Sequence, residues 1–405
     1  MIGLLCSSII FFTTLIIILV ISILIAEKKL VNQEKVELLI NNDKKVKVMP
    51  GNTLLNTLSM MNIFIPSACG GGGTCAMCKC KISTGGGEIL PTEKMHINRK
   101  EEKDNVRLAC QVKVRNDMDI HVPDEIFSIK QFTGTVTSND NVATFIKDIR
   151  FDIDNNEELK FEAGGYVQIS VPSGEYPFKN FNIPKQYRED WDKFDLWRYT
   201  CIVKEPMYRA YSMANHPAEG NKVSLTIRIA TPPPNKPDVN PGQCSSYIFS
   251  LKPGDKINFS GPYGEFFIKD NKREMIYIGG GAGMAPMRSH VFHLFHTLKS
   301  TRKVSFFYGA RSKRESFFDQ DFIDIENKFP NFKYTLALSE PLPEDKWNGP
   351  TGFINQVVYE NYLKNHEDPS EIEYYLCGPP MMIDAVVNML EDLGVEEDMI
   401  SYDKF

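Results

Sequence analysis

Short segments of alternating or continuous apolar residues, separated by turn-forming residues, recur between about residues 36 and 270. Residues 36–39 and 45–48 flank a polar turn at 41–43, which predicts a β-hairpin. Residues 53–61 have the pattern of a short helix. Farther on, several short β patterns predict an antiparallel barrel or sandwich. They lie at residues 134–137, 166–171, 223–230 and 256–260.

The pattern changes after residue 270, where strands and helices alternate. A helical pattern covers residues 287–298 and follows the first of these strands. Alternation of this kind predicts a doubly wound, parallel α/β sheet. The expected strands are 275–278, 304–308, 334–338 and 374–377.

Residues 2–26 carry no charged side chain and are rich in Ile, Leu and Phe. About 20 apolar residues, each rising ~1.5 Å, match a ~30 Å hydrocarbon core, so we expect one retained transmembrane helix. A cleaved signal peptide is the alternative, but it predicts a basic start, a shorter apolar region and small residues after it, and none of these features is present. Lys28 and Lys29 follow the span and no Lys or Arg precedes it, which places the bulk of the chain in the cytoplasm.

The length of 405 residues predicts several domains rather than one core. We expect an anchor at 1–27, a β-rich domain at 33–128, an antiparallel β-barrel at 129–270 and an α/β domain at 271–405. The net charge of −6 and the lack of a basic block argue against a nucleic-acid partner.

The cysteines are clustered, with four of nine between residues 69 and 80. Clustering favours a metal site in a reducing compartment over a disulfide framework. Cys69, Cys75 and Cys78 lie in a glycine-rich loop, and Cys110 lies farther on. This pattern is a variant of the C-x₄-C-x₂-C…C spacing of [2Fe–2S] proteins, with five residues in its first gap.

Zinc is the alternative metal, because C-x₂-C is also a zinc half-site, although no second such pair lies near Cys110. Cys80 is a further candidate, since in a strand its side chain points the same way as that of Cys78. The segment around Cys110 resembles the fourth-ligand segment of ferredoxins, and we therefore favour Cys110. The 33–128 region as a whole resembles the β-grasp fold of ferredoxins.

Within the predicted barrel, Arg209-Ala-Tyr211-Ser212 resembles the R-x-Y-S motif of the ferredoxin–NADP reductase family. Arg can pair with the pyrophosphate of FAD, Tyr can stack on the flavin ring, and the Ser hydroxyl can reach its N5 edge. The resemblance implies a catalytic role for Ser212. A strand with an exposed Arg and a packed Tyr is the alternative.

Gly242, Ser245 and Ser246 lie in a Gly-x-x-Ser segment. In the same family this segment opens a helix whose first amides hold the FAD pyrophosphate, as helix N-termini readily do. The two serines are alternatively plain helix caps.

The turn after the first α/β strand contains Gly281, Gly283 and Pro286, and it departs from G-x-G-x-x-G in the way that ferredoxin–NADP reductase relatives do. Its glycines would allow close approach to the NADH pyrophosphate.

Cys377-Gly378-Pro379 ends the last expected strand, and the resemblance implies that Cys377 borders the nicotinamide and takes part in catalysis. A buried small side chain is the alternative for Cys377. The resemblance also implies that the terminal Phe405 covers the flavin. Arg311, after the second strand, could accommodate the 2′-phosphate of NADPH, but the family resemblance favours NADH.

The complete order of anchor, ferredoxin-like domain, FAD barrel and NAD domain resembles that of the F subunits of Na⁺-translocating NADH:quinone reductases. The resemblance implies a bacterial inner-membrane subunit that passes hydride from NADH to FAD, then single electrons to [2Fe–2S] and on to partner membrane subunits, with ubiquinone reached indirectly. An oxygenase reductase component shares the order of domains and is the main alternative. A tethered binding module with a degenerate nucleotide domain is a second alternative.

Two further patterns admit simple interpretations. His290, His293 and His296 spread over about a third of a helix circumference, and we interpret them as structural. Residues 178–197 fit no barrel strand. They are either a surface excursion or, because of their aromatic residues, part of a docking surface on which partner subunits bind.

Overall fold

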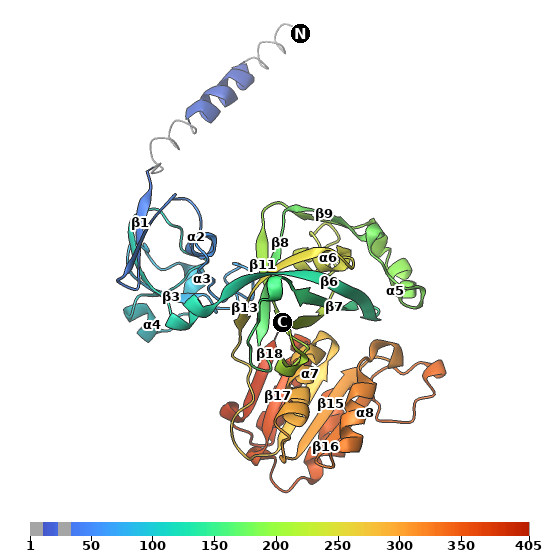
Figure 1. Cartoon of the computed structure of the whole chain (residues 1–405). Helices are drawn as coiled ribbons and strands as arrows, with labels where there is room; N and C mark the ends of the chain where they lie inside the picture. The colour runs from blue at the N-terminus through green and yellow to red at the C-terminus, as the bar shows by residue number, and fades with distance from the viewer. Residues whose placement is uncertain (1–10, 23–33, 405) are drawn as a thin grey trace, which may run out of the picture. The chain divides into compact units, whose positions relative to one another are not determined.

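The computed structural model describes residues 11–22 and 34–404 (Figure 1). The chain divides into two compact units, Met1–Ser128 and Ile129–Phe405, and each is described by itself. Residues 11–22 are helical. Over the described ranges, no helix has the length and apolar character needed to cross a membrane. The remainder of the predicted span, 2–10 and 23–26, lies outside the described residues.

The first unit contains a mixed sheet with strand order β2-β1-β5-β3-β4. The predicted hairpin is confirmed, because β1 pairs antiparallel with β2, and β1 also pairs parallel with β5. Helix α2 (Leu54–Met60) begins where Thr53 accepts a hydrogen bond from the backbone of Asn56, as an N-cap does. The strands are β1 (Val36–Ile40), β2 (Lys44–Val48), β3 (Lys79–Thr84), β4 (Val106–Leu108) and β5 (Met118–His121).

A buried ion pair fixes the end of this sheet nearest Cys110. The Arg107 guanidinium on β4 donates to both carboxylate oxygens of Glu93, at 3.0 and 2.7 Å, and to three carbonyls of the 86–88 turn. Glu93 belongs to the short helix α3 (Pro91–Lys94) and also accepts from the Leu108 backbone. Burial opposes ionisation of Glu93, but these bonds outweigh it and lower its pKa.

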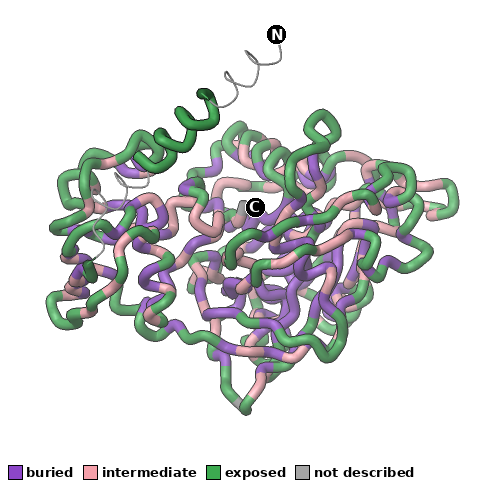
Figure 2. The backbone as a smooth tube through the Cα atoms, turned by 90° about the horizontal axis from the view of Figure 1, so that it is seen from above, coloured by how far each residue is buried: buried purple, intermediate pink, exposed green. Residues whose placement is uncertain are grey.

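The second unit begins with an antiparallel sheet of order β11-β8-β13-β6-β7-β12. Its inward side chains form a core with Phe151, Ile169 and Phe259 fully buried. Figure 2 shows buried residues in purple along the chain. The β patterns expected between residues 134 and 260 lie in this sheet, which also contains β11, named above only as the alternative for the Arg209–Ser212 segment, and β7, which was not indicated. The strands are β6 (Lys130–Ala143), β7 (Ile146–Ile153), β8 (Tyr166–Val171), β11 (Met207–Ser212), β12 (Lys222–Arg228) and β13 (Lys256–Tyr263).

The remaining sheet of this unit is fully parallel, with order β16-β15-β14-β17-β18. This confirms the α/β prediction and adds β18, which the sequence did not indicate. The principal helices are α7 (Met284–Phe292), α8 (Asp319–Lys328), α9 (Ile354–Asn361) and α10 (Pro380–Asp392). The strands are β14 (Met275–Gly280), β15 (Val304–Ala310), β16 (Phe332–Leu338), β17 (Glu373–Gly378) and β18 (Ile400–Lys404).

Helix α7 starts at Met284, earlier than the expected residue 287, and continues as a π-helical turn at His293–Thr297. Pro286 is tolerated because the first N–H groups of a helix have no intrahelical acceptor. The expectation placed the start after the proline, which explains the difference.

Residues 178–197 pack into their own unit, against the suggestion that their aromatic residues face a partner. Phe178 and Trp191 are fully buried, and the Trp191 indole donates to the Thr144 carbonyl at 2.8 Å. The segment includes helix α5 (Arg188–Lys193) and lies between strands β9 (Gly174–Pro177) and β10 (Thr200–Val203), which pair with each other. Phe194, about half exposed, is the exception among these rings.

We expect Glu93→Gln to destabilise the first unit by about 3 kcal/mol, because it leaves the Arg107 charge buried without its partner. The lowered pKa of Glu93 gives wild-type stability that is complete above the unfolded carboxyl pKa and is lost as pH falls through the folded value. The variant should lack that acid dependence. Urea unfolding of the full chain, followed by circular dichroism between pH 3 and 7, measures both effects. The exposed neighbour Glu102→Gln is the control, and equal behaviour of the two variants would contradict the prediction.

Candidate electron-transfer and nucleotide sites

The four cysteines expected as ligands meet as two pairs in the first unit. The Sγ atoms of Cys69 and Cys75 are 3.3 Å apart. A hydrogen bond between these thiols lowers the pKa of Cys69 and raises that of Cys75. Cys78 and Cys110 are paired in the same way, and their hydrogen bond raises the pKa of Cys78 and lowers that of Cys110. The structure therefore brings together the loop thiols and the distant fourth one.

The loop around these thiols suits a compact anionic group. Gly70, Gly71 and Gly73 have φ values of 61°, 92° and 76°, a region open to glycine. Backbone hydrogen bonds from Thr74 and Met77 reach the sulfurs of Cys69 and Cys75. Such donors stabilise thiolates that bind metal.

Two thiol pairs in such a loop fit a [2Fe–2S] cluster, in which each iron takes two protein ligands. A site for a single metal ion is a different matter: among the described residues, no three His, Cys, Asp or Glu side chains are grouped so that they could hold one.

Cys80 lies in β3 opposite Arg107 and is not part of either pair. Burial raises the pKa of its thiol to about 12. Cys78 is buried as well, so what separates Cys80 from the expected ligands is its place outside the two thiol pairs.

The R-x-Y-S residues do lie on a strand, β11, as the alternative interpretation had it, and they adjoin the first turn of α6 (Gln243–Ser250). Burial and the Cys244 thiol raise the pKa of Tyr211. The positive charge of Arg209 opposes this, because it lowers the pKa of both Tyr211 and Cys244. A guanidinium beside the start of a helix is a suitable environment for a pyrophosphate.

Gly242 is the N-cap residue of α6, which corrects the alternative in which Ser245 or Ser246 caps the helix. Ser245 Oγ donates to the Gly242 carbonyl and accepts from the Ala230 amide. Ser246 is completely buried. A side chain at Gly242 would lie 2.5 Å from Cβ of Ala230, so glycine is required there. Anion binding at this turn would therefore use backbone amides rather than the two hydroxyls.

Ser212 contacts a carboxylate that the sequence did not indicate. Its hydroxyl donates to Oδ2 of Asp403 on β18 at 2.7 Å. Asp403 stands opposite Cys377 in the β17–β18 register, and Cys377 is fully buried. Burial raises the pKa of both groups, and for Cys377 the Asp403 charge adds to the effect. Only the pairing of β17 with the unpredicted β18 reveals this trio.

The two nucleotide turns are in backbone contact. Cβ of a residue at Gly283 would lie 2.1 Å from the Cys377 carbonyl oxygen. Gly378 lies near the backbone of Gly280, and Pro379 is the N-cap of α10. Gly281 has a φ of 58°, in the left-handed region. The structure therefore gathers the predicted glycine turn and the Cys-Gly-Pro segment at the carboxyl edge of the sheet, where doubly wound folds bind nucleotides.

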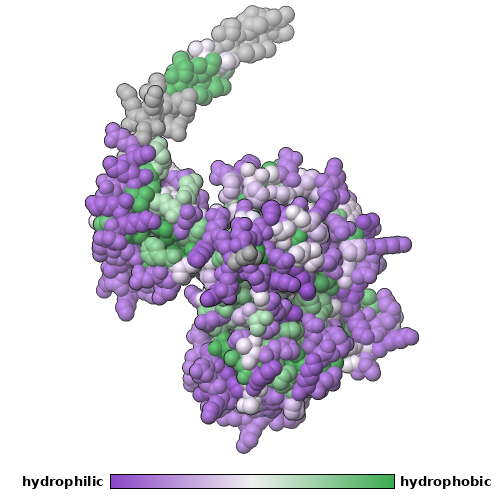
Figure 3. Space-filling view, in the orientation of Figure 1, coloured by the Kyte–Doolittle hydropathy of each residue, from purple (hydrophilic) through white to green (hydrophobic). Residues whose placement is uncertain are grey.

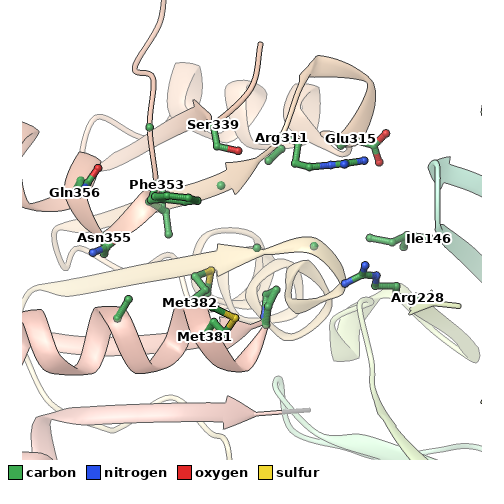
Figure 4. A pocket seen from close by; sticks show the side chains of 18 of the residues that line it. Ile146, Arg228, Arg311, Glu315, Ser339, Phe353, Asn355, Gln356, Met381 and Met382 are labelled. Carbon is green, nitrogen blue, oxygen red and sulfur yellow. The ribbon is translucent and has the colours of Figure 1, made fainter. Parts of the chain in front are cut away.

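A cavity of about 660 Å³ opens at this edge. Gly281, Arg311 and Pro379 are among its lining residues, together with Phe353 and Met381, which the sequence analysis did not single out. Figure 4 shows Arg311 and Glu315 at one end of the pocket and Phe353 with Asn355 and Gln356 at the other.

The remaining candidates have different environments. His290 is buried and hydrogen-bonds through Nε2 to the Phe266 carbonyl at 3.0 Å, which agrees with a structural role. His293 and His296 lie around the ring of His216, at centroid distances of 6.5 and 6.1 Å. Phe405 lies outside the described residues.

Three family matches cover most of the chain. Residues 39–115 match the 2Fe-2S iron-sulfur cluster binding domain, residues 193–268 the oxidoreductase FAD-binding domain, and residues 277–388 the oxidoreductase NAD-binding domain. Among solved structures, an Amycolatopsis cytochrome P450 reductase aligns with a TM-score of 0.64 at 22% identity, over 91% of this chain and 98% of its own. A ferredoxin reductase in carbazole 1,9a-dioxygenase aligns with a TM-score of 0.61 at 25% identity, over 92% and 98%.

Fold and site together define a three-domain flavoprotein reductase, in which a [2Fe–2S] ferredoxin domain precedes an antiparallel FAD domain and a parallel-sheet NAD domain. The chain is 55% identical to the F subunit of the Na⁺-translocating NADH-quinone reductase of Neisseria meningitidis serogroup B over 380 residues, 94% of each chain. It is 56% identical to the same subunit of Mannheimia succiniciproducens over 383 residues, again 94% of each. The chain belongs to the family that comprises the F subunits of the Na⁺-translocating NADH-quinone reductases.

We propose that Cys69, Cys75, Cys78 and Cys110 are the cluster ligands and that Cys80 is not. Cys110→Ser should therefore remove most of the iron and acid-labile sulfide, because serine supplies a poorer ligand for iron. Cys80→Ser should retain both, since its thiol lies outside the two pairs. Iron and sulfide analysis with EPR of the dithionite-reduced protein makes the comparison. A cluster lost from Cys80→Ser and kept in Cys110→Ser would contradict the ligand set.

Proposed function

We propose that this chain is the NADH-oxidising, electron-input subunit of a membrane-bound, Na⁺-translocating NADH:ubiquinone reductase. Family membership carries the overall activity. When bound, FAD accepts hydride and returns its electrons singly, and the cluster carries one electron at a time. The remaining steps, to partner membrane subunits and ubiquinone, belong to the complex. For the main alternative, an oxygenase reductase, the likeness is in fold, with 25% identity to the ferredoxin reductase in carbazole 1,9a-dioxygenase against 55% to the F subunit of Neisseria meningitidis.

The structural observation that best supports the catalytic part is the Ser212–Asp403 hydrogen bond. It joins the R-x-Y-S strand of the antiparallel sheet to the last strand of the parallel sheet, next to Cys377. In our proposal Arg209 and the first turn of α6 hold the flavin pyrophosphate, and Tyr211 and Ser212 orient the ring.

On the nucleotide side, the turn with Gly281, Gly283 and Pro286 receives the NADH pyrophosphate. Gly378 and Pro379 shape the wall next to it, and Cys377 borders the nicotinamide. Phe405 remains our candidate for the flavin cover, on family resemblance alone.

Membrane attachment is the second part of the proposal. The described helix at 11–22 exposes its apolar side chains, including Phe11 and Ile16, and Figure 3 shows this stretch as hydrophobic. Exposed side chains of this kind suit a lipid environment. We propose that residues 2–26 anchor the subunit once in the bacterial inner membrane, with the soluble domains on the cytoplasmic side, as Lys28 and Lys29 indicate.

The direct test is the visible spectrum of the anaerobic, full-length protein before and after NADH is added. We expect flavin bands and a broad iron–sulfur absorbance, both bleached by NADH, with the EPR signal of a reduced [2Fe–2S] centre. Reduced flavin without a cluster signal would contradict the cysteine assignment. A preparation that binds no flavin would contradict the enzyme activity itself.

Ser212→Ala should slow flavin reduction by NADH by at least about tenfold while FAD content stays unchanged, since the hydroxyl that orients the reacting ring edge is lost. Stopped-flow absorbance measures the rate. Ser224→Ala is the matched control, because the Ser224 hydroxyl also donates to a buried carboxylate, that of Asp148, at 2.8 Å, but from β12 rather than from the R-x-Y-S strand. A similar slowing in both variants would show that the effect is structural.

A further inference from the structure

A cluster of cations follows β15, the second strand of the parallel sheet. Arg311 lines the pocket, and Lys313 and Arg314 follow it. In doubly wound folds this strand end reads the 2′ position of the adenosine ribose, where an Arg accommodates the phosphate of NADPH. By sequence alone, these residues would therefore favour NADPH.

Carboxylates of helix α5, and that of the adjacent Glu315, pair with the two arginines of this cluster. Asp190 Oδ2 on helix α5 lies 3.7 Å from Arg311 Nη2 and 3.4 Å from Arg314 Nη2. Glu189 lies 3.3 Å from Arg314 Nη1, and Glu315 lies 3.4 Å from its Nε. The side chain of Asp190 is only 15% exposed, so its charge is held beside Arg311, which lines the pocket, rather than in solvent.

Helix α5 is fixed in this position by Thr144. The Thr144 carbonyl accepts from the indole of Trp191, the residue next to Asp190, at 2.8 Å. The Thr144 amide and hydroxyl both donate to Glu315, which lines the pocket. Thr144 is thus hydrogen-bonded both to helix α5 and to Glu315 in the pocket wall, and these bonds hold Asp190 beside the arginines.

We propose that Asp190, assisted by Glu189, makes the site selective for NADH over NADPH. A 2′-phosphate would bring a charge of about −1.5 to −2 toward carboxylates and would have to displace them from the arginines. The ribose 2′-hydroxyl of NADH is uncharged, so it is not repelled by the carboxylates and does not have to displace them from the arginines. The inference deepens the proposed function, on which it rests, and it gives the 178–197 segment a role within its own unit.

The test compares Asp190→Asn with Asp192→Asn in the full-length protein. Asp192 lies on the same helix, and its carboxylate accepts from the Trp197 indole, a bond that the amide oxygen of asparagine can keep. The control therefore removes the same charge from the same helix. For each variant, kcat/KM with NADH and with NADPH is measured with ferricyanide as acceptor, and NAD⁺ and NADP⁺ binding is measured by calorimetry.

We expect Asp190→Asn to raise kcat/KM for NADPH about tenfold and to tighten NADP⁺ binding in proportion, with NADH changed by less than about twofold. The gain should shrink as salt is added, since it is electrostatic. Asp192→Asn should leave the NADH/NADPH ratio unchanged. Adding Arg311→Gln to Asp190→Asn should abolish the gain, because the freed guanidinium is then absent.

An unchanged NADH/NADPH ratio in Asp190→Asn, or an equal change in Asp192→Asn, would overturn the inference. If Asp190→Asn does not fold, Glu189→Gln replaces it, since Glu189 is 80% exposed, and a gain of about threefold is then expected. Its absence would equally overturn the inference. Failure of the wild-type protein to oxidise NADH at all would instead contradict the proposed function.

Discussion

The nucleotide site depends on a backbone contact that only glycine permits. At Gly283 any Cβ would lie 2.1 Å from the Cys377 carbonyl oxygen, so the turn after β14 can close against the end of β17 only without a side chain. On its other side, β17 pairs with β18 in the register that sets Asp403 opposite Cys377. Asp403 in turn binds Ser212 on the antiparallel sheet. The end of β17 is thus where the glycine turn meets the trio that links the flavin motif to the nicotinamide wall.

In the ferredoxin unit the main constraint is electrostatic, because thiols that repel each other when ionised must be held close together. The glycine loop supplies backbone donors to the sulfurs, and the fourth thiol arrives on the segment after β4. The Arg107–Glu93 pair positions that strand, since Glu93 also accepts from the Leu108 amide, two residues before Cys110. The buried ion pair therefore ties β4, and with it the segment that carries Cys110, to helix α3.

Much of this could be predicted from sequence because glycine, cysteine and apolar strands have strong local signatures. The parallel sheet, the hairpin and the grouping of Cys69, Cys75 and Cys78 with Cys110 follow from such patterns. Strand β7 was not indicated, although apolar and charged residues alternate over 149–153 as in a half-buried strand. Only its first half departs from that pattern, where Lys147 lies buried and bonded to the carbonyls of Asn139 and Asn182. The role of Asp403 was not indicated either, because it depends on β18, a polar strand that is recognised only by its pairing with β17.

Arg311 shows most clearly why local pattern is insufficient to predict specificity. Its position in the chain predicts a phosphate acceptor, and this prediction is physically sound for an unpaired guanidinium. The carboxylate that changes the outcome lies on α5, and it reaches Arg314 across 124 residues of sequence. Whether an arginine attracts a phosphate depends on the charges that pack beside it, because a neighbouring carboxylate neutralises the guanidinium and repels the phosphate. Substrate preference in this fold is therefore a property of the packed unit, including segments that belong to no strand of either sheet.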